Sequence, residues 1–173
     1  MKSSVLRRLL TGGDRRSIAQ SDRVRALVEK NPELVEELAG LTEDDDWLVS
    51  QRAIDLLEKF AHDHVDWIEP HKRIFIGPCA ASDKWEIRLQ IVRALPLFKW
   101  PARDLARVKA ILLENLVYPQ TFVKAWALDS LATLAAKDAR LIPIVQHHLE
   151  LFDRSESKAL QARARKIRER VPL

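Results

Sequence analysis

The chain has 173 residues, with 29 Lys and Arg against 25 Asp and Glu, a formal net charge of +4 and 47% hydrophobic residues. A chain of this length and hydrophobic fraction can bury one continuous core, and its 4 glycines favour helices and argue against a disordered, glycine-rich protein. No apolar run approaches the roughly 20 residues that a spanning helix needs, so no membrane segment is predicted.

The amino-terminal segment and the single cysteine bear on location. The first residues are basic but no apolar stretch follows them, so we expect no signal peptide. Cys79 has no second cysteine with which to form a disulfide, which suits a reducing compartment, and we expect a cytoplasmic protein. Because a nucleophilic thiol needs a positioned base, we interpret Cys79, next to Pro78, as inert.

Capping residues place the helices in chain order. Residues 1–30 are expected to form an N-terminal capping region of one or two helices, and Asn31-Pro32-Glu33 then opens a helix that Gly40 closes. Further helices are expected at about 46–60, 63–77, 83–96, 101–117, 119–136 and 138–152, and from 157 onward. The short connectors favour antiparallel neighbours, so residues 31–173 are predicted to be one continuous array of about four helical hairpins.

Three of these helices are copies of one pattern. The copies begin at Val49, Ile87 and Val123, and a weaker fourth begins near Ser157, so the period is 34 to 38 residues. Repetition at such a period is typical of a solenoid, in which each unit buries its apolar face against its neighbours. The predicted fold class is therefore an all-α solenoid.

The repeated helices resemble those of HEAT repeats. An acidic residue precedes a β-branched and basic pair in Asp83…Ile87-Arg88, the pair recurs in Val123-Lys124, and the first copy has Asp46…Val49 followed by Ser50. The resemblance covers roughly residues 31–170. It implies a right-handed α-solenoid of HEAT-like hairpins whose second helices line the concave side, and it implies no particular activity.

Two sets of positions follow from the repeat. Positions 0, +4, +5, +8 and +11 of each copy form a broad apolar stripe and are predicted to face the core. They are Val49, Ala53, Ile54, Leu57 and Phe60; Ile87, Ile91, Val92, Leu95 and Phe98; and Val123, Ala127, Leu128, Leu131 and Leu134. Positions +3 and +6 lie off this stripe, where the concave surface is expected. They are Arg52 and Asp55, Gln90 and Arg93, Trp126 and Asp129, and Leu160 and Arg163.

The +6 row alternates in charge, through Asp55, Arg93, Asp129 and Arg163. Adjacent helices pack about 8–10 Å apart, within reach of Arg–carboxylate pairs. One interpretation is a row of ion pairs between repeats that fixes their register; the other is a polar groove that binds a ligand. Trp126 has the same two interpretations, burial against a neighbouring repeat or exposure in a groove.

Charge is distributed in blocks along the chain. Residues 31–70 are strongly acidic, whereas the segments on both sides are basic. This is not the continuous positive track expected of a duplex-binding protein. The last helix concentrates Arg163, Arg165, Lys166, Arg168 and Arg170, which fits either the solvated outer face of a terminal repeat or a basic patch for nucleic acid or an acidic partner.

Motifs for catalysis or metal binding are weak. One connection is rich in possible metal ligands but lacks the spacing of a known metal site: His62, Asp63, His64, Asp66 and His71. No phosphate-binding loop or nucleophile elbow occurs in the sequence. We therefore expect no catalytic residues, no metal and no cofactor.

The leading hypothesis is a non-catalytic HEAT-repeat adaptor that binds a protein or peptide on its concave surface. The expected binding residues are Arg52, Asp55, Gln90, Arg93, Trp126, Asp129 and Arg163, with a basic patch at Arg165, Lys166, Arg168 and Arg170. The alternative is nucleic-acid binding or DNA repair, because some HEAT-like proteins are alkylpurine DNA glycosylases. Trp126, Asp129 and Arg93 are residue types that stabilise a cationic base or sugar.

Overall fold

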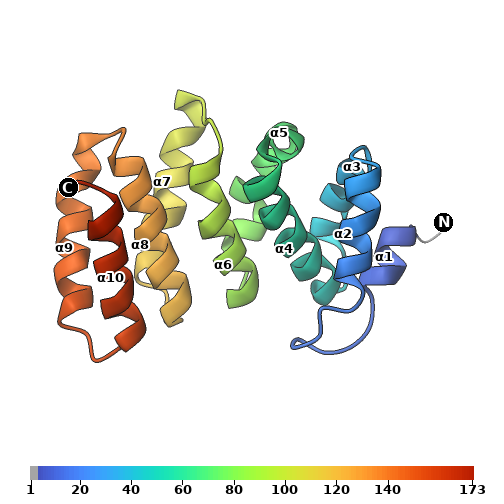
Figure 1. Cartoon of the computed structure of the whole chain (residues 1–173), viewed down its shortest axis with the longest axis horizontal. Helices are drawn as coiled ribbons and strands as arrows, with labels where there is room; N and C mark the ends of the chain where they lie inside the picture. The colour runs from blue at the N-terminus through green and yellow to red at the C-terminus, as the bar shows by residue number, and fades with distance from the viewer. Residues whose placement is uncertain (1–3) are drawn as a thin grey trace. The chain divides into compact units, whose positions relative to one another are not determined.

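The structure is a computed structural model that describes residues 4–173; the first part of the basic amino-terminal segment, Met1-Lys2-Ser3, lies outside these residues. Every regular element in residues 4–173 is a helix (Figure 1). The α-helices are α1 (Val5–Leu10), α2 (Ser21–Lys30), α3 (Leu34–Gly40), α4 (Trp47–Asp63), α5 (Val65–Ile68), α6 (Trp85–Ala94), α7 (Ala102–Leu116), α8 (Thr121–Ala135), α9 (Ile142–Asp153) and α10 (Lys158–Arg170). Short 3-10 helices connect them: η1 (Leu41–Glu43), η2 (Glu69–Ile76), η3 (Pro78–Ala81), η4 (Leu95–Leu97) and η5 (Ala139–Leu141).

Contacts divide the chain into two compact units, one ending at Phe98 and the other comprising Lys99–Leu173. In the first unit α4 packs against α3 and α6, and in the second unit α8 packs against α7, α9 and α10. Each unit is therefore built from helical hairpins whose second helices lie side by side, as the repeat predicted. The all-α class and the two N-terminal helices, α1 and α2, are confirmed.

The predicted caps begin several helices. The Asp46 side chain accepts a hydrogen bond from the Leu48 amide at 3.0 Å at the start of α4. Ser157 accepts from the Leu160 amide at 3.4 Å at the start of α10. Each cap satisfies one of the amide groups that a helix start leaves without a partner, which explains why these boundaries were predictable from the sequence.

The segment predicted as one helix over 63–77 is wrong in its detail. It consists of the four-residue helix α5 followed by the longer 3-10 helix η2. Pro70 is at the start of η2 and has no amide hydrogen, so it cannot donate the bond that would continue α5. The chain tightens to 3-10 geometry instead, as helices often do where an α-helical bond is missing.

The predicted core is buried with one exception. Fourteen of the fifteen stripe positions are buried, and Leu131 has an exposed fraction of 0%. Leu134, near the end of α8, is only half-buried. The equivalent positions of the other two copies, Phe60 and Phe98, are buried, so this exposure is confined to the end of α8. No helix in residues 4–173 is both long and apolar enough to cross a membrane.

Candidate functional site

In the first unit, polar side chains link the two repeated helices α4 and α6. Gln90 Nε2 donates a hydrogen bond to Asp55 Oδ1 at 3.1 Å, and Arg93 Nη2 lies 3.1 Å from Glu58 Oε1. Lys59 Nζ, one turn along α4, pairs with Asp55 Oδ2 at 2.7 Å. The sequence placed Asp55 opposite Arg93, but α6 is offset along α4, so that Arg93 meets the carboxylate one turn further on.

Glu58 is the residue that the sequence analysis missed. Its side chain has an exposed fraction of 0%, yet Oε1 contacts both Arg93 and His62 Nε2, the latter at 2.8 Å. Within the described residues Oε2 has no hydrogen-bond partner. The signal was available: the equivalent positions of the next two copies are Pro96 and Ala132, so a carboxylate there departs from the repeat.

Burial raises the pKa of the Glu58 carboxyl, and the positive charges of Arg93 and His62 oppose this effect without cancelling it. The folded state therefore holds this proton more tightly than the unfolded chain, in which a Glu has a pKa of about 4.3. As the pH rises from about 4.3 through the folded-state pKa, the folded protein loses that advantage, so this group lowers stability with rising pH.

We expect Glu58→Gln to remove this dependence, because the amide does not titrate. Urea denaturation across pH 4.5–7.5, a range that begins just above the ordinary Glu pKa of about 4.3, measures the effect. We expect the free energy of unfolding of the wild type, relative to that of the variant, to fall as the pH rises. Glu36→Gln, at an exposed position on α3, is the matched control, and we expect it to leave the pH dependence of the free energy of unfolding unchanged. This account is contradicted if the free energy of unfolding of the wild type, minus that of Glu58→Gln, stays constant or grows as the pH rises.

In the second unit, the polar contacts centre on Trp126 and Asp129 of α8. The Arg163 guanidinium, from α10, lies over the Trp126 ring with its Cζ 3.9 Å from the ring centroid. Asp129 accepts from Arg163 at 3.0 Å and from Arg170 at 2.6 Å, and Arg170 also donates to Thr133 Oγ1 at 2.9 Å. Trp126 is half-buried, so it is partly covered by an arginine and partly exposed.

This arrangement can recognise a partner because its groups are held in place while part of each remains accessible. The exposed fractions of the Arg163 and Arg170 side chains are 20% and 45%. The guanidinium groups can donate to backbone carbonyls and carboxylates of a bound segment, and the indole ring supplies apolar contact area. We call Asp55, Gln90 and Arg93 the first polar row, and Trp126, Asp129 and Arg163 the second polar row.

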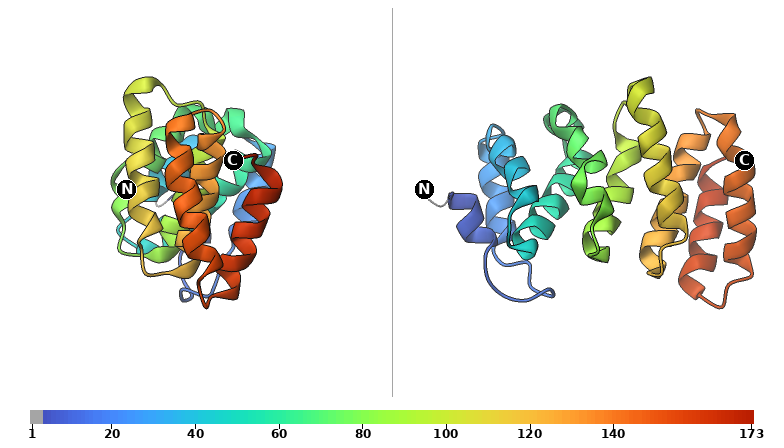
Figure 2. Two further views of the ribbon diagram at one scale, coloured as in Figure 1. Left: turned by 90° about the vertical axis from the view of Figure 1, so that its left-hand side faces the viewer. Right: turned by 180° about the vertical axis from the view of Figure 1, so that it is seen from behind.

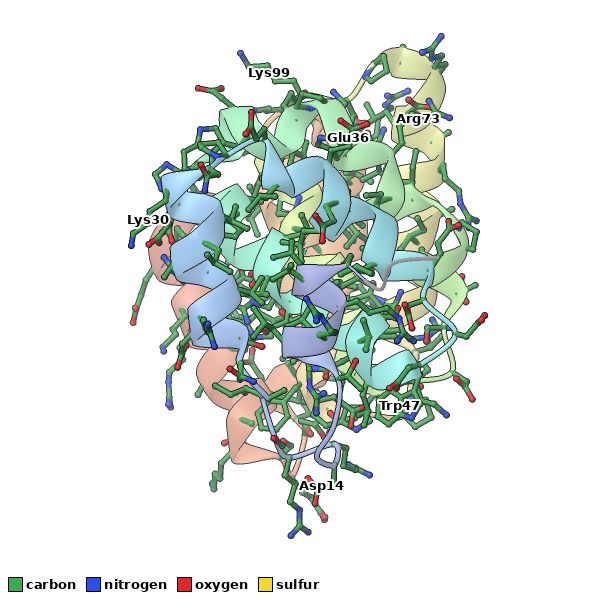
Figure 3. The ribbon with its side chains drawn as sticks, turned by 90° about the vertical axis from the view of Figure 1, so that its right-hand side faces the viewer. Asp14, Lys30, Glu36, Trp47, Arg73 and Lys99 are labelled. Atoms are coloured by element: carbon green, nitrogen blue, oxygen red, sulfur yellow. The ribbon has the colours of Figure 1, made fainter. Side chains whose placement is uncertain are left out.

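Arg52 does not lie on the expected surface. Its side chain is buried, and it donates to the carbonyl oxygens of Leu10, Asp14 and Ser17 in the connection between α1 and α2. This connection extends beyond the helix ends in Figure 2, and Figure 3 shows Asp14 at its tip. Burial lowers the pKa of the Arg52 guanidinium from its ordinary value, and the charges of Asp46 and Asp14 oppose that shift. Arg52 therefore anchors a loop.

The four residues of the expected basic patch are all exposed on α10, but they divide into two kinds. Arg168 forms a two-point ion pair with Asp153, with bonds of 3.0 and 2.6 Å, and Arg170 pairs with Asp129. No ion pair within the described residues involves Arg165 or Lys166. The patch of unpaired charge is thus smaller than the sequence suggested.

The histidine-rich connection has individual structural roles. His62 contacts Glu58, Asp63 pairs with Arg25 at 2.7 Å, and the His64 ring stacks on Trp67 with 4.0 Å between centroids. Cys79 Sγ donates to the Thr42 carbonyl at 3.3 Å, and burial raises the pKa of its thiol, which keeps it protonated at neutral pH.

Comparison with known proteins identifies the fold. No family model matches the chain, and no curated protein matches it in sequence. The chain is similar in structure to a crystal structure of an engineered protein, with a TM-score of 0.63 and 20% identity over 95% of this chain and 77% of that one. It is also similar to a designed armadillo repeat protein in complex with the peptide (KR)4, with a TM-score of 0.66 and 13% identity over 95% of this chain and 79% of that one.

A second engineered protein aligns with a TM-score of 0.62 and 19% identity, covering 95% of this chain and 46% of that one. The chain therefore has an all-α helical-repeat fold like that of these engineered and designed repeat proteins.

Proposed function

We propose that the protein is a non-catalytic helical-repeat adaptor that binds a protein or peptide segment through the polar rows of its repeated helices. The observation that carries this proposal is the set of polar contacts that link the repeated helices within each unit. Gln90 meets Asp55 in the first unit, and Arg163 meets Asp129 and covers Trp126 in the second. Side chains fixed in this way lose little conformational entropy on binding, which favours recognition.

The similar designed armadillo protein supports the proposal, since its structure holds a bound peptide. The interpretation as a row that fixes register is compatible with binding in the second unit, where Arg163 and Arg170 hold Asp129 and remain 20% and 45% exposed. In the first unit Gln90 is buried, contrary to its expected place on the surface, so Asp55 and Arg93 are the groups available there. The glycosylase alternative needs an accessible carboxylate and aromatic face. Asp129 is held by two arginines and Trp126 is covered by one of them, so no observation favours that alternative.

Selection from a random peptide library on the immobilised full chain tests the proposal. We expect enriched peptides to bind saturably and their affinity to fall at least about tenfold, or about 1.4 kcal/mol, in Trp126→Ala or Asp55→Ala. Arg165→Ala and Glu36→Ala are matched surface controls, and circular dichroism verifies that each variant is folded. The proposal is contradicted if the enriched peptides bind Trp126→Ala and Asp55→Ala as tightly as they bind the wild type.

Titration of the protein with a random DNA duplex at two salt concentrations distinguishes the nucleic-acid-binding hypothesis from the adaptor hypothesis. For a protein that contacts phosphates, log K falls by about 0.9 per contact for each tenfold rise in salt. We expect no saturable duplex binding at physiological salt. Tight duplex binding with a steep salt slope, reduced by Arg165→Ala, would replace the adaptor hypothesis with a nucleic-acid-binding one.

A further inference from the structure

Exposed apolar side chains gather at one end of the second unit. Within Lys99–Leu173 the large hydrophobic residues that are exposed are Leu113, Val117, Phe122 and Leu151, with exposed fractions of 36%, 74%, 52% and 46%. Leu113 and Val117 are four residues apart at the end of α7, Phe122 is in the first turn of α8, and Leu151 is in the last turn of α9. Scattered exposed hydrophobic residues need no explanation, but Val117 and Leu151 line one groove, and apolar side chains that share a groove indicate an interaction site.

A groove of about 350 Å³ lies at this end of the unit. Its apolar walls come from the ends of three helices, α7, α9 and α10: Leu116, Val117, Leu151, Phe152 and Leu160. Figure 1 shows the connection between α9 and α10 at the lower end of the unit, where α8 also begins. Pro119 follows α7 and cannot continue it, so the chain turns away and leaves Val117 without a covering helix.

The charge of the groove indicates which segment fits it. The titratable side chains that line it are Lys124 and His148, and no carboxylate lines it. Lys124 forms no ion pair within the described residues. Burial and the neighbouring His147 lower the pKa of His148, so this ring is neutral at pH 7 and can take part in a hydrogen bond.

The surrounding unit adds to this positive charge. It contains 14 Lys and Arg against 8 Asp and Glu. Several of its carboxylates are already neutralised: Asp138 by Lys109 and Arg140, Asp153 by Arg168, and Asp129 by two arginines. Lys158, in the first turn of α10, is exposed and has no ion pair within the described residues. A partner with negative charge is therefore favoured over a basic one.

We propose that this groove, lined by Val117, Leu151 and Lys124, docks an acidic amphipathic segment of a partner protein. A Leu or Phe side chain of that segment inserts between Val117 and Leu151, and an Asp or Glu beside it pairs with Lys124. An apolar anchor in a groove with a charged rim is a common mode of helical peptide recognition. The groove is separate from both polar rows, so this inference does not depend on the function proposed above.

Fluorescence anisotropy with the full chain tests the proposal. The probe is a labelled amphipathic peptide of about twelve residues with Leu and Phe on one face and Asp and Glu beside them. Two matched peptides replace either the acidic residues by Lys or the apolar residues by Ser. We expect saturable binding of the acidic probe, at least tenfold weaker binding of both matched peptides, and an affinity that falls as salt is raised.

Variants locate the binding. Val117→Asp and Leu151→Ser are expected to weaken binding of the acidic probe at least tenfold, and Lys124→Glu is expected to shift preference to the Lys-containing peptide. Val5→Asp, at an exposed apolar position in the first unit, is the control and leaves binding unchanged.

Three outcomes overturn the proposal. The first is the absence of saturable binding of the acidic probe, and the second is equal binding of the acidic and basic peptides. The third is a concentration-dependent dimer in sedimentation that Val117→Asp abolishes, which would assign the groove to a second copy of this chain. Because Val117, Leu151 and Val5 are exposed and Lys124 is half-buried, circular dichroism of each variant is expected to match the wild type.

Discussion

Replacing Arg52 by Ala is expected to lower the free energy of unfolding by about 3–5 kcal/mol and to release the connection between α1 and α2. Arg52 is 2% exposed and donates to three carbonyl oxygens of that connection. A hydrogen bond to a charged group contributes about 1.5–3 kcal/mol, and carbonyl groups left without a partner in a buried setting add their desolvation cost. Urea denaturation measures the loss of stability.

Limited proteolysis provides the second readout for Arg52. A freed connection is cleaved faster than one that is anchored, because proteases need a locally unfolded backbone. Arg23→Ala, at an exposed position on α2, is the matched arginine control and is expected to change stability by less than about 0.5 kcal/mol. If Arg52→Ala and the wild type have equal urea denaturation midpoints and equal rates of cleavage in the connection between α1 and α2, Arg52 does not anchor that connection.

The second large effect is expected for Leu131→Ala in α8. Leu131 has an exposed fraction of 0%, so truncation removes buried surface and leaves a cavity, at a cost of about 2–5 kcal/mol. Leu134→Ala makes the same chemical change one turn further along the same helix, at a half-buried position. We expect that change to cost about 1 kcal/mol.

The comparison of the two leucines tests the orientation of α8 directly. Both substitutions change helix propensity equally, so the difference between their denaturant midpoints reports burial alone. A loss at Leu134 as large as that at Leu131 would show that α8 is rotated relative to this structure.

The periodic features of the sequence were sufficient to predict the fold. The apolar stripe recurs at positions that only a helix brings to one face, and caps such as Asp46 and Ser157 specify where helices begin because they act within a few residues. Pro70 is a local feature that the periodicity does not reveal, and it replaces part of the predicted helix with 3-10 geometry.

The polar contacts were predicted less well because they depend on how one helix is displaced along another. A sequence alignment of copies placed Asp55 opposite Arg93, but the displacement of α6 along α4 is set by the shapes of the packed side chains. That displacement brings Glu58 to Arg93 and Gln90 to Asp55. Arg52 illustrates a second limit, since its partners are carbonyl groups about 40 residues earlier in the chain, and no side-chain pattern reveals them.

The way Arg52 holds its loop has a consequence for sequence change. The guanidinium binds main-chain oxygens, which every amino acid supplies, so the anchoring places no demand on the identities of the loop side chains. The demands that remain fall on Gly12, Gly13 and Ala19, whose φ angles are +91°, +73° and +50°, and on Asp14 and Ser17, whose side chains accept hydrogen bonds from the amides of Arg16 and Ala19. The other positions of this loop are therefore open to mutational drift and to grafting of foreign epitopes, provided that Arg52 is kept.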